Sequence, residues 1–479
     1  METKKRASWS GQLAFVLAAA ASAIGLGNIW RFPYLAAQYG GGTFILVYLC
    51  LVVTLGFTLM LTEIAIGRKT QQSQLTAFSR LHGKWGFVGL LGTIIPVLIT
   101  PYYCVIGGWV LYYFKEYLVM AVTGAQVMGE GAANSGQFFG AFISAPFAPF
   151  GYGMIFVLAC AGVIVMGVKN GIEKSNLVMM PILFLMAIGI SIYVICMPGS
   201  GAGLKYTLMP TLDSLRGADG SFSIAMLGKT ILGAMGQMFY SLSLAMGIMI
   251  TYGSYMRKED SIERSVRRIE IFDTLIAILA ALMIIPVVYM FAVKTGTPIK
   301  EAMNAGPGLM FITLPKVFAT LGAAGAWIGV AFFLLVTFAA ATSAISLYEA
   351  CVAAVCDVLH IDRRAATFFT GTLVLFLATF SALGYGPWAK ITIFGQQFLD
   401  FFDFITNSVL MPIVAAAICI FVGWVLKPQS VIDEVEQCGH KFKAHGFYSF
   451  MVRYLAPALV IAILISEVCR YFKIGGWAI

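Results

Sequence analysis

About eleven long apolar stretches dominate this chain of 479 residues, of which 60% are hydrophobic and only 11% are charged. A soluble domain has roughly a quarter of its residues charged. A helix crosses a bilayer with roughly 20 apolar residues, whereas an outer-membrane barrel shows short alternating segments. We therefore predict an all-α polytopic membrane protein with about 11 transmembrane helices. The stretches lie near 10–37, 41–67, 86–120, 151–168, 175–197, 222–256, 266–294, 322–356, 365–384, 390–426 and 447–472.

The basic residues predict how the chain is oriented in its membrane. If the N-terminus is cytoplasmic, 20 of the 31 Lys and Arg residues fall in cytoplasmic segments, ten fall outside and Arg31 lies within the membrane. Lys and Arg are enriched in cytoplasmic loops, so we expect a cytoplasmic N-terminus and an outside C-terminus. The apolar stretches make a lipid bilayer the expected partner. The basic loops are short and scattered, so we expect no nucleic acid as partner.

Two of the apolar stretches carry their own helix breakers. The first contains "SAIGLGN" (22–28), followed by Arg31, and the sixth contains "SLSLAMG" (241–247). Glycines alone would indicate close helix packing, but polar groups such as Asn28 and Arg31 at this depth are costly and usually functional. Paired interruptions in two halves predict a 5+5 inverted repeat with unwound helices 1 and 6.

An unwound segment supplies polar groups for binding. Backbone groups in the hydrocarbon region must find partners, so the freed carbonyls can bind a cation. The N-terminal end of the following half-helix can hold a carboxylate. One break therefore offers places for an ion and for an amino acid.

No residue pattern indicates an enzyme. The nine cysteines and four histidines are scattered and lack the spacing of metal ligands. We expect no catalytic residues and no metal other than sodium.

The stretch "GLGNIWRFPYLAAQYGGGTF" (25–44) resembles the first-helix signature of the neurotransmitter:sodium symporter family. Other similar pieces follow in order: "EIAIGR" (63–68), "PYYCVIGGW" (101–109), "GQMFYSLSLAMG" (236–247), "DTLIAILAALMIIP" (273–286), "GLMFITLPKVF" (308–318) and "FAAATSAIS" (338–346). The resemblance implies symport of amino acids or related amines with sodium, by alternating access. Eleven spans resemble the bacterial amino-acid transporter branch, which implies a bacterial inner membrane.

With this resemblance the chain divides into segments of expected role. They are a cytoplasmic N-terminal latch (1–8), the first five-helix repeat (9–197), an extracellular loop (198–221), the second, inverted repeat (222–426) with an extracellular lid (295–321), a cytoplasmic loop (427–446), and the eleventh helix with the C-terminus (447–479).

The resemblance implies two sodium sites, and oxygen ligands suit this hard cation. Sodium site 1 would use Ala23, Asn28, Ser241 and Asp273, completed by the substrate carboxylate. Sodium site 2 would use backbone oxygens of Ala21, Ile24 and Ala339 with the hydroxyls of Thr342 and Ser343. In isolation, those two hydroxyls could instead bond back to their own helix.

Asp273 departs from the animal members of the family, which have Asn there and need chloride. The family's chloride position matches Tyr48, Gln237, Ser241 and a serine that is replaced here by Ala277. An ionised Asp273 supplies the same charge as a chloride ion, so Asp273 is the expected chloride substitute and no chloride is expected. The alternative is a structural aspartate near a helix start.

The resemblance also implies a substrate pocket and two gates. The pocket residues would be Ser22, Gly25, Gly27, Ile99, Tyr103, Tyr240, Ser243, Met246, Ser343 and Leu347. The extracellular gate would pair Arg31 with Asp403, with Asp400 as a competitor, beside Tyr103 and Tyr240. The intracellular gate would join Arg6 and Trp9 to Ser254, Tyr255 and Asp357.

No acidic residue replaces Gly25, so we expect a neutral, apolar amino acid rather than a simple amine. An ion channel, a non-transporting amino-acid sensor and a proton-coupled relative are the alternatives. The sequence leaves open which amino acid is preferred, the number of ions per cycle and the oligomeric state.

Overall fold

The computed structural model describes residues 6–125, 134–217, 220–304 and 306–472. Every named element within them is a helix, which confirms the all-α prediction. Residues 1–5 of the predicted latch and residues 473–479 of the predicted C-terminal segment lie outside the described residues.

Nine helices in the described part of the chain are long and apolar enough to cross a membrane. A tenth crossing is the bent pair formed by α1 (Gln12–Ala23) and the continuous helix η1–α2 (Gly27–Gln38), whose axes differ by 55°. The nine are Gly42–Thr70 (α3, η2 and α4), Gly83–Thr123 (η3 and α6), Ala148–Val165 (α8), Val168–Ile195 (η5 and α9), Ile262–Thr295 (α13), Ala323–Leu359 (α16), Arg363–Leu383 (α17), Phe398–Leu426 (α18 to η9) and His445–Tyr471 (α21 to α22).

The expected sixth span is interrupted over a longer stretch of residues than the first span. It consists of α11 (Ile224–Ser241) and the short α12 (Ile248–Gly253), separated by residues 242–247. This pair is not among the ten crossings. The count of eleven and the inverted repeat therefore stay predictions, whereas the two interruptions lie where the sequence places them.

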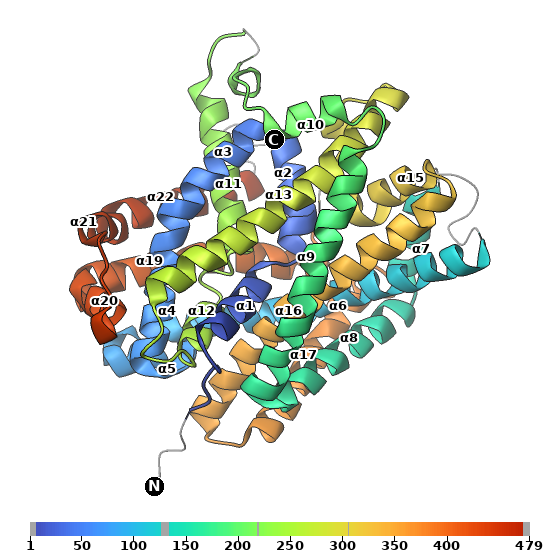
Figure 1. Ribbon diagram of the computed structural model, residues 1–479. Coiled ribbons are helices and arrows are strands. Elements are labelled where there is room, and N and C mark those ends of the chain that lie inside the picture. Colours follow the sequence, from blue (N-terminus) through green and yellow to red (C-terminus); the bar gives the residue numbers. More distant parts are fainter. Residues whose placement is uncertain (1–5, 126–133, 218–219, 305, 473–479) are drawn as a thin grey trace.

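The two broken segments lie side by side in the middle of the bundle. Helix α1 packs against α12, and η1 and α2 pack against α11. Helix α1 also contacts α9, α13 and α16 (Figure 1). This arrangement brings the two breaks next to each other inside the bundle.

Local backbone geometry explains the breaks. Ile24 is extended, with φ −76° and ψ 98°, and ends α1. In the second break Ser243, Ala245 and Gly247 all have positive φ, at 53°, 59° and 77°. Non-glycine residues in such conformations cost about 1–3 kcal/mol each and persist where the surroundings hold them. Glu63 of α4 (Phe57–Thr70) is one such support, because its Oε1 accepts a hydrogen bond from the Ala245 N–H at 2.7 Å.

Short helices cover both ends of the bundle. We call the end where α1 begins the N-terminal end; α5 (Gln74–Leu81) and α20 (Pro428–Val435) lie there. The opposite end carries α10 (Gly201–Leu208) and the predicted lid, which forms α14 (Ile299–Ala302), η7 (Leu309–Thr313) and α15 (Leu314–Ala319) (Figure 1). The lid is tied to α6 (Gly86–Thr123) because the Tyr113 hydroxyl donates to the Phe311 carbonyl at 3.1 Å.

Candidate functional site

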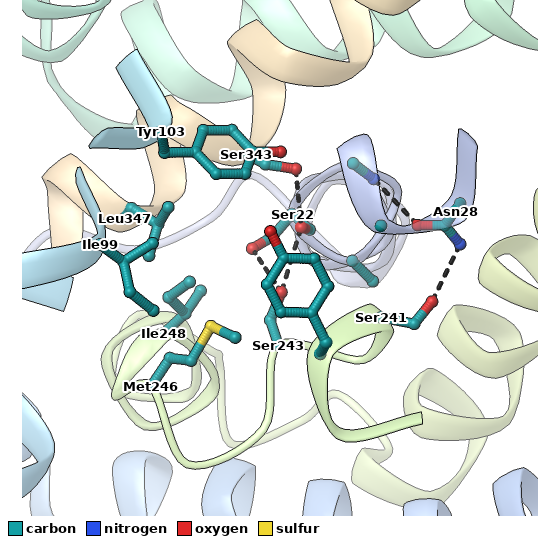
Figure 2. A pocket seen from close by; sticks show the side chains of 14 residues that line it. Ser22, Asn28, Ile99, Tyr103, Ser241, Ser243, Met246, Ile248, Ser343 and Leu347 are labelled. Carbon is teal, nitrogen blue, oxygen red and sulfur yellow. Dashed lines mark hydrogen bonds between the residues drawn. The ribbon is translucent and has the colours of Figure 1, made fainter. Parts of the chain in front are cut away.

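A small cavity lies between the two breaks (Figure 2). It contains all ten residues predicted for the substrate pocket. The remaining lining residues are Ala23, Asn28 and Ser241, expected at sodium site 1, and Ile248, which the sequence reasoning missed. Ile248 follows directly on the "SLSLAMG" stretch, and this adjacency is the signal that could have found it.

Gly25 and Gly27 are required because the cavity has no room for side chains there. A Cβ atom on Gly25 would lie 2.6 Å from the Ser343 Oγ and 2.7 Å from the Tyr103 hydroxyl. A Cβ atom on Gly27 would overlap the ring of Tyr240. Both glycines therefore bring backbone to the cavity surface, where a bound molecule can reach it.

One end of the cavity is polar. Ser343 Oγ donates to the carbonyls of Ser22 and Ile24, at 3.0 and 3.2 Å, and Ser243 Oγ donates to the Ser22 carbonyl at 3.1 Å. The Tyr103 hydroxyl accepts from the Leu26 N–H at 3.1 Å and lines the same end of the cavity. The other end is apolar and is formed by Ile99, Met246, Ile248 and Leu347 (Figure 2).

Asp273, on α13 (Ile262–Thr295), is fully buried and held by neutral donors only. The Asn28 amide donates to Oδ1 at 2.7 Å, the Ser241 hydroxyl lies 2.9 and 3.0 Å from the two oxygens, and the Tyr48 hydroxyl donates to Oδ2 at 3.1 Å. No Lys or Arg among the described residues pairs with it within 4.0 Å. The carboxylate and hydroxyl oxygens converge here with the Asn28 amide, whose nitrogen faces them while its oxygen accepts from the Gly25 N–H. Ala23 lines the same cavity. Carboxylate and hydroxyl oxygens are ligands of the kind that sodium prefers.

The residues expected at sodium site 2 are brought together less completely. Ser343 reaches across from α16 (Ala323–Leu359) to the Ile24 carbonyl, as described above. Thr342 instead bonds back to its own helix, at 3.0 Å from the Phe338 carbonyl and 3.1 Å from that of Ala339. Ala21 is buried in the last turn of α1. The back-bonding alternative therefore applies to Thr342 and not to Ser343.

The predicted ion pair between Arg31 and Asp403 is not formed within 4.0 Å in this structure. The Arg31 guanidinium lies over the Tyr240 ring, 5.5 Å from its centroid. Asp403 accepts instead from the Tyr102 hydroxyl at 3.1 Å and from the Asn407 amide at 2.6 Å. Both charges therefore have other neighbours, although they lie near enough to interact electrostatically. Tyr102 precedes Tyr103 in the quoted "PYYCVIGGW", but nothing in the sequence singled out Asn407.

The expected competitor of Asp403 has a partner of its own. Asp400 accepts from the Tyr385 hydroxyl at 2.9 Å. In the described chain Arg31 forms no ion pair with this carboxylate either.

The residues expected at the intracellular gate do meet, at the N-terminal end. Arg6 Nη1 lies 2.7 Å from Asp357 Oδ1, its Nε donates to Ser254 Oγ at 2.9 Å, and its guanidinium lies over the Tyr255 ring. Burial by itself would lower the pKa of Arg6, because it disfavours the charged guanidinium. Tyr255 and Asp357 more than compensate, so the pKa of Arg6 lies above its ordinary value. Trp9 is fully buried and its backbone N–H donates to the Tyr255 carbonyl at 3.1 Å.

Two further contacts at this end were not foreseen. The buried Glu173 accepts from the Ser10 N–H at 3.0 Å and also bonds to the Ser10 hydroxyl. Arg68, at the end of α4, pairs with Glu434 of α20 at 2.8 Å, and both side chains are almost completely buried. These partners are far apart in sequence, so neither pair has a sequence signal.

Comparisons with known proteins agree with one another. The model of the sodium:neurotransmitter symporter family matches residues 6–129 and 151–477. The chain is 31% identical to the uncharacterised sodium-dependent transporter YhdH of Bacillus subtilis, over 97% of this chain and 98% of that protein. It is 24% identical to the human sodium- and chloride-dependent GABA transporter 2, over 98% of this chain and 81% of that protein.

The solved structures include a similar protein with a bound amino acid. The crystal structure of MhsT in complex with L-phenylalanine superposes with a TM-score of 0.83 and 33% identity. The match covers 97% of this chain and all of that chain.

Proposed function

This chain belongs to the sodium:neurotransmitter symporter family, and from that premise we propose that it imports a neutral, apolar amino acid with sodium by alternating access. Membership makes it a sodium-dependent, multi-pass membrane transporter and not an enzyme, as predicted. The observation that carries the substrate proposal is the cavity, which is polar at one end, apolar at the other and free of charged lining residues.

Each end of an amino acid has a counterpart in this cavity. The Tyr103 hydroxyl and the backbone beside Gly25 would hold the carboxylate next to a sodium ion. The Ser22 carbonyl, which accepts from the Ser243 and Ser343 hydroxyls in this structure, would accept from the ammonium group when one of these hydroxyls turns away. Ile99, Met246, Ile248 and Leu347 would cover an apolar side chain. The related MhsT structure, with its bound L-phenylalanine, supports this substrate class.

We further propose two sodium sites and no chloride requirement. Asp273, Ser241, Asn28 and Ala23 would hold one ion, and the group around Ser343 and Ile24 the other. The hydroxyls of Tyr48 and Ser241, which match the family's chloride position, both bond to the Asp273 carboxylate. In this proposal an ionised Asp273 would supply the negative charge that chloride supplies in other members.

The orientation proposal rests on the basic loops, which favour a cytoplasmic N-terminus and an outside C-terminus in a bacterial inner membrane. Arg6, Trp9 and Asp357 would then form the intracellular gate. Arg31, Asp403, Tyr103 and Tyr240 would lie on the extracellular side of the cavity, below the lid at 295–321.

A thermal-shift screen of the twenty amino acids, with and without sodium, tests the proposal. A ligand that binds only the folded state stabilises it by mass action. We expect stabilisation by apolar amino acids in sodium and not in potassium. Stabilisation that ignores sodium would favour the proton-coupled alternative. Sodium-dependent binding without uptake into proteoliposomes would favour a sensor, and conductance without saturable uptake would favour a channel.

A further inference from the structure

Gln74, the first residue of α5, is a buried polar side chain without a partner. It is 2% exposed, and neither its amide oxygen nor its amide nitrogen has a hydrogen-bond partner. More than nine in ten buried polar groups in proteins are paired, so each exception needs an explanation. Gln74 plays no part in the site as described so far.

The Gln74 carboxamide lies between two glycines of neighbouring elements. A Cβ atom on Gly247 would lie 2.5 Å from Gln74 Oε1, and one on Gly92 of α6 would overlap Nε2. Gly247 stands between Met246 and Ile248, which both line the substrate cavity. Gln74 therefore touches the back of the cavity wall.

The acceptor of Gln74 also faces unsatisfied donors. Gly247 is the N-cap residue of α12, and no side chain caps that helix. The first N–H groups of a helix have no partner within it. An amide oxygen without a donor and helix N–H groups without an acceptor thus lie next to each other.

The start of α5 is anchored independently. The Ser73 N–H donates to Asp357 Oδ2 at 2.6 Å, while the other oxygen of Asp357 pairs with Arg6. The same carboxylate therefore anchors the residue before Gln74 and belongs to the expected intracellular gate.

We propose that Gln74 is a positioning residue of the substrate cavity, which caps the second half of the broken helix and thereby fixes Met246 and Ile248 in the cavity wall. A small movement of Gly247 closes a hydrogen bond from the start of α12 to Oε1, and contacts of a substrate with the two flanking side chains favour that movement. The inference rests on the proposed function, since it takes the cavity as the substrate site.

The test compares substitutions that keep or remove the acceptor. Gln74→Glu keeps an oxygen that can accept, whereas Gln74→Leu fills similar space without one. Gln72→Leu is the matched control, because Gln72 lies two residues before Gln74 and its side chain accepts locally, from the Thr76 hydroxyl at 2.8 Å. Equilibrium binding of radiolabelled L-phenylalanine and L-leucine is measured in sodium, together with KM and kcat of uptake.

We expect Gln74→Leu to weaken substrate binding about tenfold, the size of a lost helix cap. KM should rise with it while kcat changes less, and Gln74→Glu and Gln72→Leu should stay within about threefold of wild type. Wild-type affinity in Gln74→Leu, or equal losses in Gln74→Leu and Gln74→Glu, would overturn the proposal. If Gln74→Leu does not fold, Gln74→Asn, which draws the acceptor back by one methylene, replaces it under the same criteria. Failure of wild type itself to bind either amino acid in sodium would reject the proposed substrate class instead.

Discussion

The side-chain nitrogen of Asn28 lies 2.7 Å from Oδ1 of Asp273. An amide in the first broken span therefore donates directly to a carboxylate on α13. The Asn28 oxygen, meanwhile, accepts from the Gly25 N–H at 3.1 Å across the break. The conformation of the unwound stretch and the position of the buried carboxylate are thus linked through one side chain.

The first prediction concerns chloride. Replacing chloride by gluconate should leave sodium-dependent binding by wild type unchanged, because Asp273 supplies the fixed negative charge. Asp273→Asn should lose about tenfold or more in affinity without chloride and regain part of it when chloride is added. Adding Ala277→Ser, which supplies a further hydroxyl, should strengthen that recovery.

Equilibrium binding in matched sodium salts measures this effect. Glu263→Gln is the control, since Glu263 lies on the same helix but pairs with Arg267 at the protein surface. A wild type that stops binding in gluconate would show that Asp273 does not replace the anion.

The second prediction concerns the space around Gly25. Gly25→Ala should weaken substrate binding about tenfold or more, because the added methyl group must displace the Ser343 hydroxyl or the Tyr103 hydroxyl. Gly11→Ala meets nothing within 4 Å and should bind like wild type. Calorimetric titration compares the two variants, and equal affinities would mean that the cavity wall adapts freely at this point.

Much of the site follows from local sequence, because a broken helix needs breakers and polar groups at the break. Gly25, Gly27 and the "SLSLAMG" stretch mark both interruptions, and quoted motifs contain most of the cavity residues. Contacts between side chains from distant segments cannot be predicted from local sequence motifs. Arg31 is an example, since its guanidinium lies over the Tyr240 ring while Asp403 bonds to Tyr102 and Asn407.

The charged pairs at the N-terminal end show the same limit. Arg68 and Glu434 are 366 positions apart, and nothing near either residue indicates the other. The count of eleven spans stays a prediction for a different reason, because α11 and α12 are separated by residues 242–247 and do not form one long apolar helix. Gln74 could not be recognised either, since its burial depends on the glycines that surround it.

The third prediction concerns stability. Arg68 pairs with Glu434 and also donates to the Asp260 carbonyl at 2.7 Å, so it joins α4, the loop before α13 and α20. Removing one partner of a buried ion pair costs about 3–5 kcal/mol. Arg68→Ala should therefore lower the unfolding temperature in detergent clearly. Arg216→Ala breaks an exposed pair with Asp213 and should cost about 0–1 kcal/mol. A melting curve for Arg68→Ala that matches that of Arg216→Ala would contradict the expectation.

The last prediction concerns the N-terminal end as a gate. Asp357 holds both Arg6, at 2.7 Å, and the Ser73 N–H, at 2.6 Å. Arg6→Ala removes one of these contacts, whereas Asp357→Ala removes both. If substrate binds tightly only while this end is closed, apparent affinity falls with the closed fraction.

We therefore expect binding to weaken severalfold in Arg6→Ala and further in Asp357→Ala. The partly exposed pair alone is worth only about 1 kcal/mol, so the larger loss in Asp357→Ala would come from the loosened start of α5. Arg80→Ala, on the exposed side of α5, should bind like wild type. Equal affinities in the Arg6→Ala and Asp357→Ala variants would show that the bond between Ser73 and Asp357 does not contribute. The effect would then come from the ion pair alone.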